Sequence, residues 1–146
     1  MKANTKTEAE VMVVLNQLIE AYKKQDLDGA LALYAPDPDV VTIGTGVDEK
    51  RVGLAERKAQ LERDFTQVKE ISVQLGWYSV SAAGSVAWVA SDVVARAKVG
   101  RQETSTPMRA TFVLEHRRGR WLIVHSHNSL PAAEQKEGES WPTGSS

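Results

Sequence analysis

Two histidines near the end of the chain, His125 and His127, have the residue type and the spacing that suit proton transfer. Residues two apart on a β-strand point to the same face, and imidazole titrates near neutral pH. Either could act as a general acid or base, and His127 is the candidate for catalysis. No neighbouring pattern supplies a third metal ligand, so no metal is expected. The alternative is that both histidines are hydrogen-bonded residues at a pocket edge or subunit contact.

Asp92 and Arg109 are the charged candidates on the two strands expected before the histidines. Asp92 interrupts an apolar run and shares a strand face with Trp88 and Val94, an environment that could raise its pKa and make it a base. Arg109 could bind a carboxylate in bidentate fashion. An ion pair with Arg109 is the simpler structural explanation of Asp92. Arg109 could equally form its ion pair with Glu103, Asp92 or Glu115.

The histidines lie on a predicted strand that spans residues 119–131, which Pro131 ends because proline cannot donate to a ladder. Strict alternation along this strand predicts two faces, each apolar at its start and polar at its end. One face would carry Trp121, Ile123, His125 and His127, and the other Leu122, Val124, Ser126 and Asn128.

The elements that must position these residues begin with three predicted helices. Thr7 and Glu10 form a capping-box pattern, after which apolar residues recur at helical spacing as far as Tyr22. Asp26 or Asp28 could cap a second, short helix that Pro36 and Pro38 end. A third helix is predicted over residues 53–66, and its charged residues are interpreted as a solvated surface: Glu56, Arg57, Lys58, Glu62, Arg63 and Asp64.

The rest of the chain is predicted to form strands. A short strand is expected at residues 40–43, and long alternating segments follow at 71–83, 86–98 and 103–116, before the last strand. Short turns between the long segments favour an antiparallel meander. Helices first and strands after predict an α+β domain, with three N-terminal helices packed on one face of a curved, mostly antiparallel sheet.

Composition adds broad limits. The 146 residues are 42% hydrophobic and 25% charged, with a net charge of −1 and no cysteine. These values predict a soluble cytoplasmic protein with no disulfide, no membrane span and no nucleic-acid partner. A single domain is expected over residues 1–131. Residues 132–146 are rich in Glu, Lys, Gly and Ser and are expected to form an arm or loose tail.

Three stretches carry a resemblance to a known superfamily: residues 22–35, residues 84–89, and residues 109–111 followed by 119–127. Together they resemble the nuclear transport factor 2-like superfamily, particularly its SnoaL-like branch. The closing stretch is also similar to the association domain of calcium/calmodulin-dependent kinase II. The resemblance implies a cone-shaped, cystatin-like fold with a pocket. It does not fix the chemistry, because this fold serves enzymes, transport factors and assembly hubs.

The resemblance also tests individual positions. The ketosteroid isomerases of the superfamily carry a basic aspartate after the second helix, where this chain has residues 41–44, Val-Thr-Ile-Gly, so steroid isomerisation is not expected. Phe112 and Asn128 stand where the kinase association domain has pocket arginines. Their presence implies a more neutral, aromatic-lined cavity, with these expected walls: Trp88, Phe112, Leu114, Tyr22 and Trp77.

Two classes of function follow. The pocket could bind a small, partly apolar molecule and catalyse isomerisation, cyclisation or dehydration, or the domain could be a non-catalytic ligand-binding or oligomerising module. The proton-transfer candidates are Asp92, His127 and Tyr22, and the binding candidates are Trp88, Arg109, Phe112, His125 and Asn128. No cofactor is expected. A homodimer or higher homo-oligomer is predicted through the open sheet face, on which Trp121 and Ile123 are expected to lie.

Overall fold

The computed structural model describes residues 1–142, and the predicted tail extends past them into residues 143–146. Helix α1 (Thr5–Lys24) begins after Asn4, whose side-chain oxygen accepts from the amide of Thr7 at 2.8 Å. The predicted capping box of Thr7 and Glu10 is therefore wrong, because Asn4 caps the helix one turn earlier.

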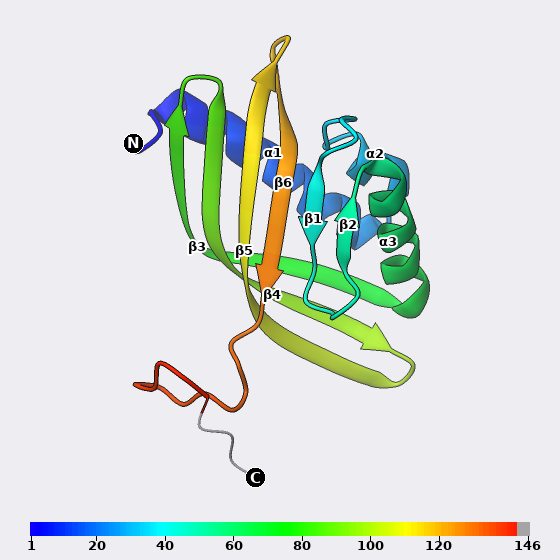
Figure 1. Ribbon diagram of the computed structural model, residues 1–146. Helices are drawn as coiled ribbons and strands as arrows, with labels where there is room; N and C mark the ends of the chain where they lie inside the picture. The colour runs from blue at the N-terminus through cyan, green and yellow to red at the C-terminus, as the bar shows by residue number, and fades with distance from the viewer. Residues whose placement is uncertain (143–146) are drawn as a thin grey trace.

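Two further helices follow. Helix α2 (Leu27–Leu31) is capped by Asp26, and helix α3 (Leu54–Gln67) begins after Gly53, whose φ of 84° lies in the region that favours glycine. Figure 1 shows α1 behind the sheet, with α2 and α3 beside the short strands. The three predicted helices are confirmed.

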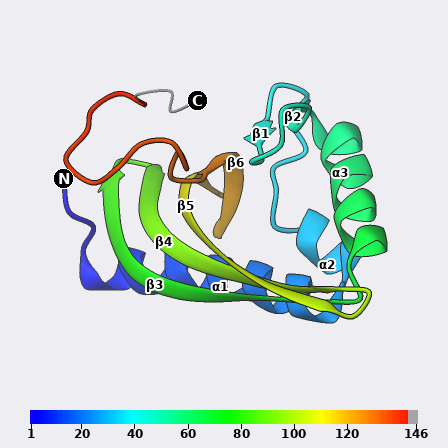
Figure 2. The same cartoon turned by 90° about the horizontal axis from the view of Figure 1, so that it is seen from below.

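The sheet has six strands: β1 (Val41–Ile43), β2 (Lys50–Val52), β3 (Glu70–Ala83), β4 (Val86–Val99), β5 (Gln102–Arg117) and β6 (Arg120–Ser129). Their order is β2-β1-β6-β5-β4-β3, and only the pairing of β1 with β6 is parallel. The α+β fold and the meander of four long strands are confirmed. Figure 2 shows β3, β4 and β5 bending strongly along their length.

A β-bulge in β6 changes which residues share a face. Val113 of β5 pairs with His125, whereas the next residue, Leu114, pairs with Ile123, so Val124 has no partner in this ladder. One extra residue reverses the alternation. Trp121 and Ile123 therefore lie on the same face of the sheet as the residues beyond the bulge, Ser126 and Asn128.

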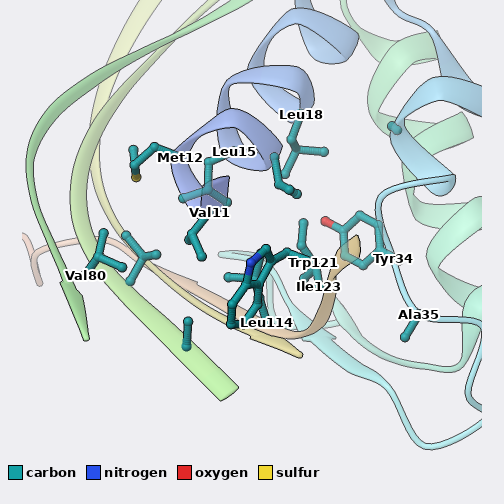
Figure 3. Packing of buried hydrophobic residues seen from close by; sticks show 14 of the residues in the cluster. Val11, Met12, Leu15, Leu18, Tyr34, Ala35, Val80, Leu114, Trp121 and Ile123 are labelled. Carbon is teal, nitrogen blue, oxygen red and sulfur yellow. The ribbon is translucent and has the colours of Figure 1, made fainter. Parts of the chain in front are cut away.

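This bulge corrects the predicted faces of the last strand. Trp121 and Ile123 are buried in the core cluster between the sheet and α1, with Val11 and Leu15 of the helix and Leu114 of β5 (Figure 3). They do not lie on the open sheet face, so the argument that based a homodimer on them is wrong. His125 and His127 remain on that open face, opposite α1.

Residues 33–35 join the helices to the sheet. The amide of Ile123 donates to the carbonyl of Leu33 at 2.8 Å, and the amide of Ala35 donates back to the carbonyl of Ile123 at 2.9 Å. Strand β1 then takes over the same edge of β6, from the pairing of Val41 with His125 onward. The side chain of Tyr34 is thereby held at a fixed position, buried between the helices and the sheet.

After β6, residues 130–142 form neither helix nor strand. No helix among residues 1–142 is both long and apolar enough to cross a membrane.

Candidate functional site

A cavity of about 270 Å³ lies between the concave face of the sheet and the helices. Its walls come from α1, α3, the segment after α2, the β1–β2 hairpin and the long strands β3 to β6. Beyond the bulge, β6 contributes Ser126 and Asn128, and β5 contributes Phe112, Ala110 and Met108. The bent sheet and the helices thus form a cavity beside the core cluster of buried hydrophobic residues.

Arg57 of α3 forms the centre of a polar cluster on the helical side of the cavity. Its Nη2 donates to the hydroxyl oxygens of Tyr22, at 2.8 Å, and of Tyr34, at 2.9 Å. Its guanidinium carbon lies 5.0 Å from the centre of the Tyr34 ring, a cation–π distance. The ring of Tyr22 in turn packs edge-on against Phe65, with centroids 5.5 Å apart. The cluster therefore joins α1, α3 and the segment after α2.

Burial and charge set the protonation states of this cluster. Burial raises the pKa of Tyr22 to about 12, although the nearby charge of Arg57 opposes the rise. Burial alone would lower the pKa of Arg57, but the oxygens of Tyr34 and Tyr22 more than offset this and raise it. At neutral pH the cluster is thus a guanidinium cation with Tyr22 as a protonated phenol beside it.

Asp64 supplies a carboxyl group to the same cavity. Its Oδ1 accepts from Nε2 of Gln60 at 2.7 Å, and Oε1 of Gln60 accepts from Nε of Arg51 at 3.0 Å. Desolvation raises the pKa of Asp64, while the bond from Gln60 and the charge of Arg57 hold it down. A carboxyl with a raised pKa can both accept and release a proton closer to neutral pH than an ordinary aspartate.

Three side-chain atoms within residues 1–142 are buried and have no hydrogen-bond partner: Thr42 Oγ1, Arg57 Nε and Asn128 Oδ1. All three residues line this one cavity. Thr42 of β1 stands beside Ser126 in the parallel register, and Asn128 is two residues further along β6. The unpaired atoms therefore come from both sides of the cavity, one from the helices and two from the sheet.

The predicted site residues divide between the two faces of the sheet. Tyr22, Phe112 and Asn128 line the cavity. The other five project from the opposite, open face, because they alternate with cavity or core residues along their strands: Trp88, Asp92, Arg109, His125 and His127. The structure does not bring these two groups together, and the roles assigned to all eight stay predictions.

The open-face residues have contacts of their own. Asp92 stands opposite Arg109 in the β4–β5 register, but the described residues show no ion pair between them. Instead, Nε of Arg109 donates to the hydroxyl of Ser129 at 3.2 Å. Two further expected cavity walls lie elsewhere, since Leu114 is in the core and Trp77 is 61% exposed.

Sequence reasoning missed Arg57, Gln60 and Asp64, and it interpreted two of them as part of a solvated surface. The structure corrects this, since all three line the cavity. Their spacing of i, i+3 and i+7 places them along one side of α3, beside the apolar stripe of Leu54, Leu61 and Phe65. A polar stripe at helical spacing next to the apolar one was the available signal.

Residues 1–142 contain no group of three or more histidine, aspartate or glutamate side chains placed to hold a metal ion. The residues that line the cavity supply a guanidinium cation, phenols, carboxyl groups, hydroxyls and amides.

The fold is shared with solved structures. A nuclear transport factor 2-like superfamily protein from Salmonella enterica is 19% identical, with a TM-score of 0.83, over 95% of this chain and 100% of that one. A protein from Streptomyces avermitilis, provisionally named a dehydratase of the NTF2-like family, is 17% identical with a TM-score of 0.81, over 89% and 100%. These likenesses show the fold.

A third structure, from Xanthomonas campestris, is provisionally named a calcium/calmodulin dependent protein kinase II association domain. It is 23% identical with a TM-score of 0.77, over 90% of this chain and 95% of that one. None of the curated protein sequences compared with the chain matches it. At the level of sequence families, residues 11–133 match the SnoaL-like domain. This match covers most of the chain, and the chain therefore belongs to the SnoaL-like domain family.

Proposed function

We propose that the chain binds a small, partly apolar organic molecule in the cavity, and that Asp64 exchanges protons with it. The observation that carries this proposal is the gathering of Thr42 Oγ1, Arg57 Nε and Asn128 Oδ1, all buried and unpaired, around one cavity. Folding normally satisfies buried polar groups, because each unmet group costs about 1–3 kcal/mol. The polar groups of a bound molecule would supply the missing partners.

The cavity residues have different proposed roles, which follow from their chemistry. Arg57 and its two tyrosines hold an oxygen of the bound molecule, since donors aimed at a developing negative charge stabilise it most in a site shielded from water. Asp64, in the same cavity, accepts a proton from a neighbouring atom or returns one. Apolar side chains of the long strands, such as Phe112 and Val93, contact the body of the molecule.

The comparisons support the same class of reaction. The Streptomyces avermitilis protein carries the provisional name of a dehydratase. Dehydration needs a group that removes one proton and a group that delivers another, which is acid–base chemistry of the kind proposed for Asp64. Isomerisation and cyclisation make the same demand.

Binding is tested with small neutral and anionic fragments and ¹⁵N-labelled protein. Fragments that enter the cavity shift the backbone resonances of Phe112 and Asn128, which lie on its sheet wall. The matched variants are Ala110→Leu and Thr111→Leu, because Ala110 faces the cavity and its neighbour faces the open side of the sheet. Ala110→Leu should abolish the shifts and Thr111→Leu should leave them. Equal effects of the two variants would contradict the cavity as the binding site.

Proton transfer is tested without knowing the substrate. Cyclohexanone and 2-oxobutanoate both exchange carbon-bound protons for deuterium in D₂O, and NMR follows the rate. The protein should accelerate exchange of at least one of them, and Asp64→Asn should lose about 10²-fold or more of that acceleration. Asp92→Asn and His127→Ala test the residues that the sequence suggested. If either of these removes the acceleration and Asp64→Asn does not, the role proposed for Asp64 is wrong.

A third outcome separates the two classes of function. Fragments that bind in the cavity without any acceleration of exchange would favour a non-catalytic binding module.

A further inference from the structure

Three hydrogen-bond donors in the Arg57 cluster have no acceptor in the described part of the chain. Nη2 of Arg57 donates to both tyrosine oxygens, so Tyr22 and Tyr34 use their oxygens as acceptors and keep their hydroxyl hydrogens. Within residues 1–142 neither hydroxyl donates a hydrogen bond, and the N–H at Nε of Arg57 is buried without a partner. Three donors from three segments of the chain thus meet at one place with nothing to bind.

The charge of Arg57 also has no ion-pair partner among the described residues. Among the described residues no carboxylate lies within 4.0 Å of its guanidinium, although two acidic side chains line the cavity. Asp64 accepts from Gln60, and Glu49 pairs with Arg63 at 3.4 Å. A buried charge is costly unless an opposite charge and hydrogen bonds meet it. What the cluster lacks is an anion with several acceptor positions.

The unpaired atoms on the sheet side of the cavity would be satisfied by a different chemical group. Thr42 Oγ1 and Asn128 Oδ1 are buried there without partners, on the adjacent strands β1 and β6. A hydroxyl group both donates and accepts, so it satisfies an asparagine side chain in either orientation as well as a threonine.

We infer, on the basis of the small-molecule function proposed above, that the ligand is a hydroxylated carboxylic acid. Its carboxylate binds Arg57, Tyr22 and Tyr34, and its hydroxyl binds Thr42 and Asn128. A carboxylate offers about four acceptor positions and a full charge, whereas a ketone oxygen offers two positions and no charge. A phosphate dianion fits less well, because the carboxyl groups of Asp64 and Glu49 line the same cavity and would repel it.

The size of the cavity limits the ligand further. A volume of about 270 Å³ is just below the usual range of about 300–1,000 Å³ for ligand pockets. A single-ring or short-chain acid fits such a space, and 4-hydroxyphenylacetate is a suitable probe.

Three probes separate the groups of the ligand: 4-hydroxyphenylacetate, 4-hydroxyphenylacetamide and phenylacetate. Calorimetry on the wild-type chain should show the hydroxylated acid binding about tenfold or more tightly than its neutral amide. It should also bind more tightly than phenylacetate, which lacks the hydroxyl.

Matched variants assign each preference to its residues. Tyr22→Phe keeps the ring against Phe65 and removes one donor, so it should weaken the acid about fivefold or more and affect the amide less. Arg57→Met should remove the preference for the acid over the amide. Lys58→Met loses the same charge from the next, exposed position of α3 and should change nothing. Thr42→Val should reduce the preference for the hydroxylated acid over phenylacetate.

The outcomes distinguish this inference from the proposed function. If the amide or a neutral fragment binds in the cavity as tightly as the acid, the carboxylate inference is wrong and the small-molecule site stands. If the acid binds but Arg57→Met and Lys58→Met weaken it equally, the donor cluster is not its receptor. If no small molecule, neutral or anionic, shifts the resonances of the cavity residues, the proposed function itself is overturned.

Discussion

The indole nitrogen of Trp121 lies 3.0 Å from Oε2 of Glu10 and donates to it. This bond joins the last strand to the first helix, between residues that lie 111 positions apart in the sequence. It also holds α1 over the concave face of the sheet. In this position α1 covers the core that lies next to the cavity. The polar side of a buried aromatic residue thus contributes to the closure of the fold.

Trp121→Phe should lower the free energy of unfolding by about 1–2 kcal/mol, because it keeps an aromatic ring in the core and removes the bond to Glu10. Urea unfolding monitored by circular dichroism measures the change. The control is Lys6→Ala, which removes an exposed ion pair to the same Glu10 at 3.9 Å and should have little effect. A Trp121→Phe variant as stable as the wild type would show that the bond contributes nothing.

Thr42→Val should raise the free energy of unfolding by about 1 kcal/mol in the absence of ligand. Valine has nearly the same shape as threonine, and it replaces a buried hydroxyl that has no partner with a methyl group. Thermal unfolding of the two proteins gives the comparison. Thr42→Ser keeps the hydroxyl and loses the methyl, so it should destabilise the fold. Loss of stability on Thr42→Val would mean that the hydroxyl is satisfied in solution.

The stability of the chain should depend on Asp64 with a definite sign. Its pKa is raised in the fold, with Tyr22, Arg57, Gln60, Glu49 and Arg63 as its neighbours. The folded state then binds more protons than the unfolded one, so stability from this group falls as pH rises from the unfolded pKa through the raised one. Asp64→Asn should remove this decrease in stability. Relative to the wild type, the variant should therefore gain stability as the pH rises above the raised pKa of Asp64.

Asp37 gives the opposite sign and serves as the control. Hydrogen bonds from Arg117, at 2.7 and 2.6 Å, hold the pKa of Asp37 below its usual value. Its contribution is present above the unfolded pKa and is lost as pH falls through the lowered one. Unfolding curves from pH 3 to 8 on the wild type, Asp64→Asn and Asp37→Asn separate the effects. Parallel curves for the wild type and Asp64→Asn would contradict the raised pKa.

Deletion of Val124 should disrupt the fold. A regular β6 would turn either Trp121 and Ile123 out of the core or Ser126 and Asn128 out of the cavity. Removal of two large core side chains costs about 3 kcal/mol or more, so cooperative unfolding should weaken or vanish. Val124→Ala keeps the length of the strand and should cost far less. Equal stability of the deletion and of Val124→Ala would show that the bulge is dispensable.

A homodimer through the open sheet face stays a prediction, on different residues from those first expected. Trp88, Val94 and Val113 lie on that face and are partly exposed. Light scattering in dilute solution should give the mass of a dimer or of a larger assembly, and Trp88→Glu should reduce it to that of the monomer. A wild-type chain that stays monomeric at every concentration would contradict the prediction.

The sequence predicted the fold because its periods are clear, with helical spacing up to Tyr22 and alternation after Lys69. It could not predict the bulge. Residues 121–124 are all apolar, so alternation is lost at the position where the register changes. Strand β2 was missed because Lys50 and Arg51 make it too polar and too short to show a pattern.

The cavity cluster was hidden for a related reason. A charged residue on an amphipathic helix usually contacts solvent, and Arg57 lies within a run of charged residues that mostly do so. Its partners Tyr22 and Tyr34 are 35 and 23 residues away, so only the packing of α3 against the other helices brings them together. Phe112 and Asn128 were within reach of sequence reasoning because the resemblance supplied their positions. For Tyr22 the resemblance pointed one turn earlier, to Leu18.

The bulge at Val124 also bears on how this chain can diverge. Before the bulge, β6 supplies core side chains that α1 covers, and beyond it the same strand supplies side chains that line the cavity. In the proposed site, substitutions at Ser126 or Asn128 would alter recognition of the ligand and would leave the core residues Trp121 and Ile123 unchanged. A designed library can therefore be confined to the second half of β6. New specificities could then be selected there without repacking of the core.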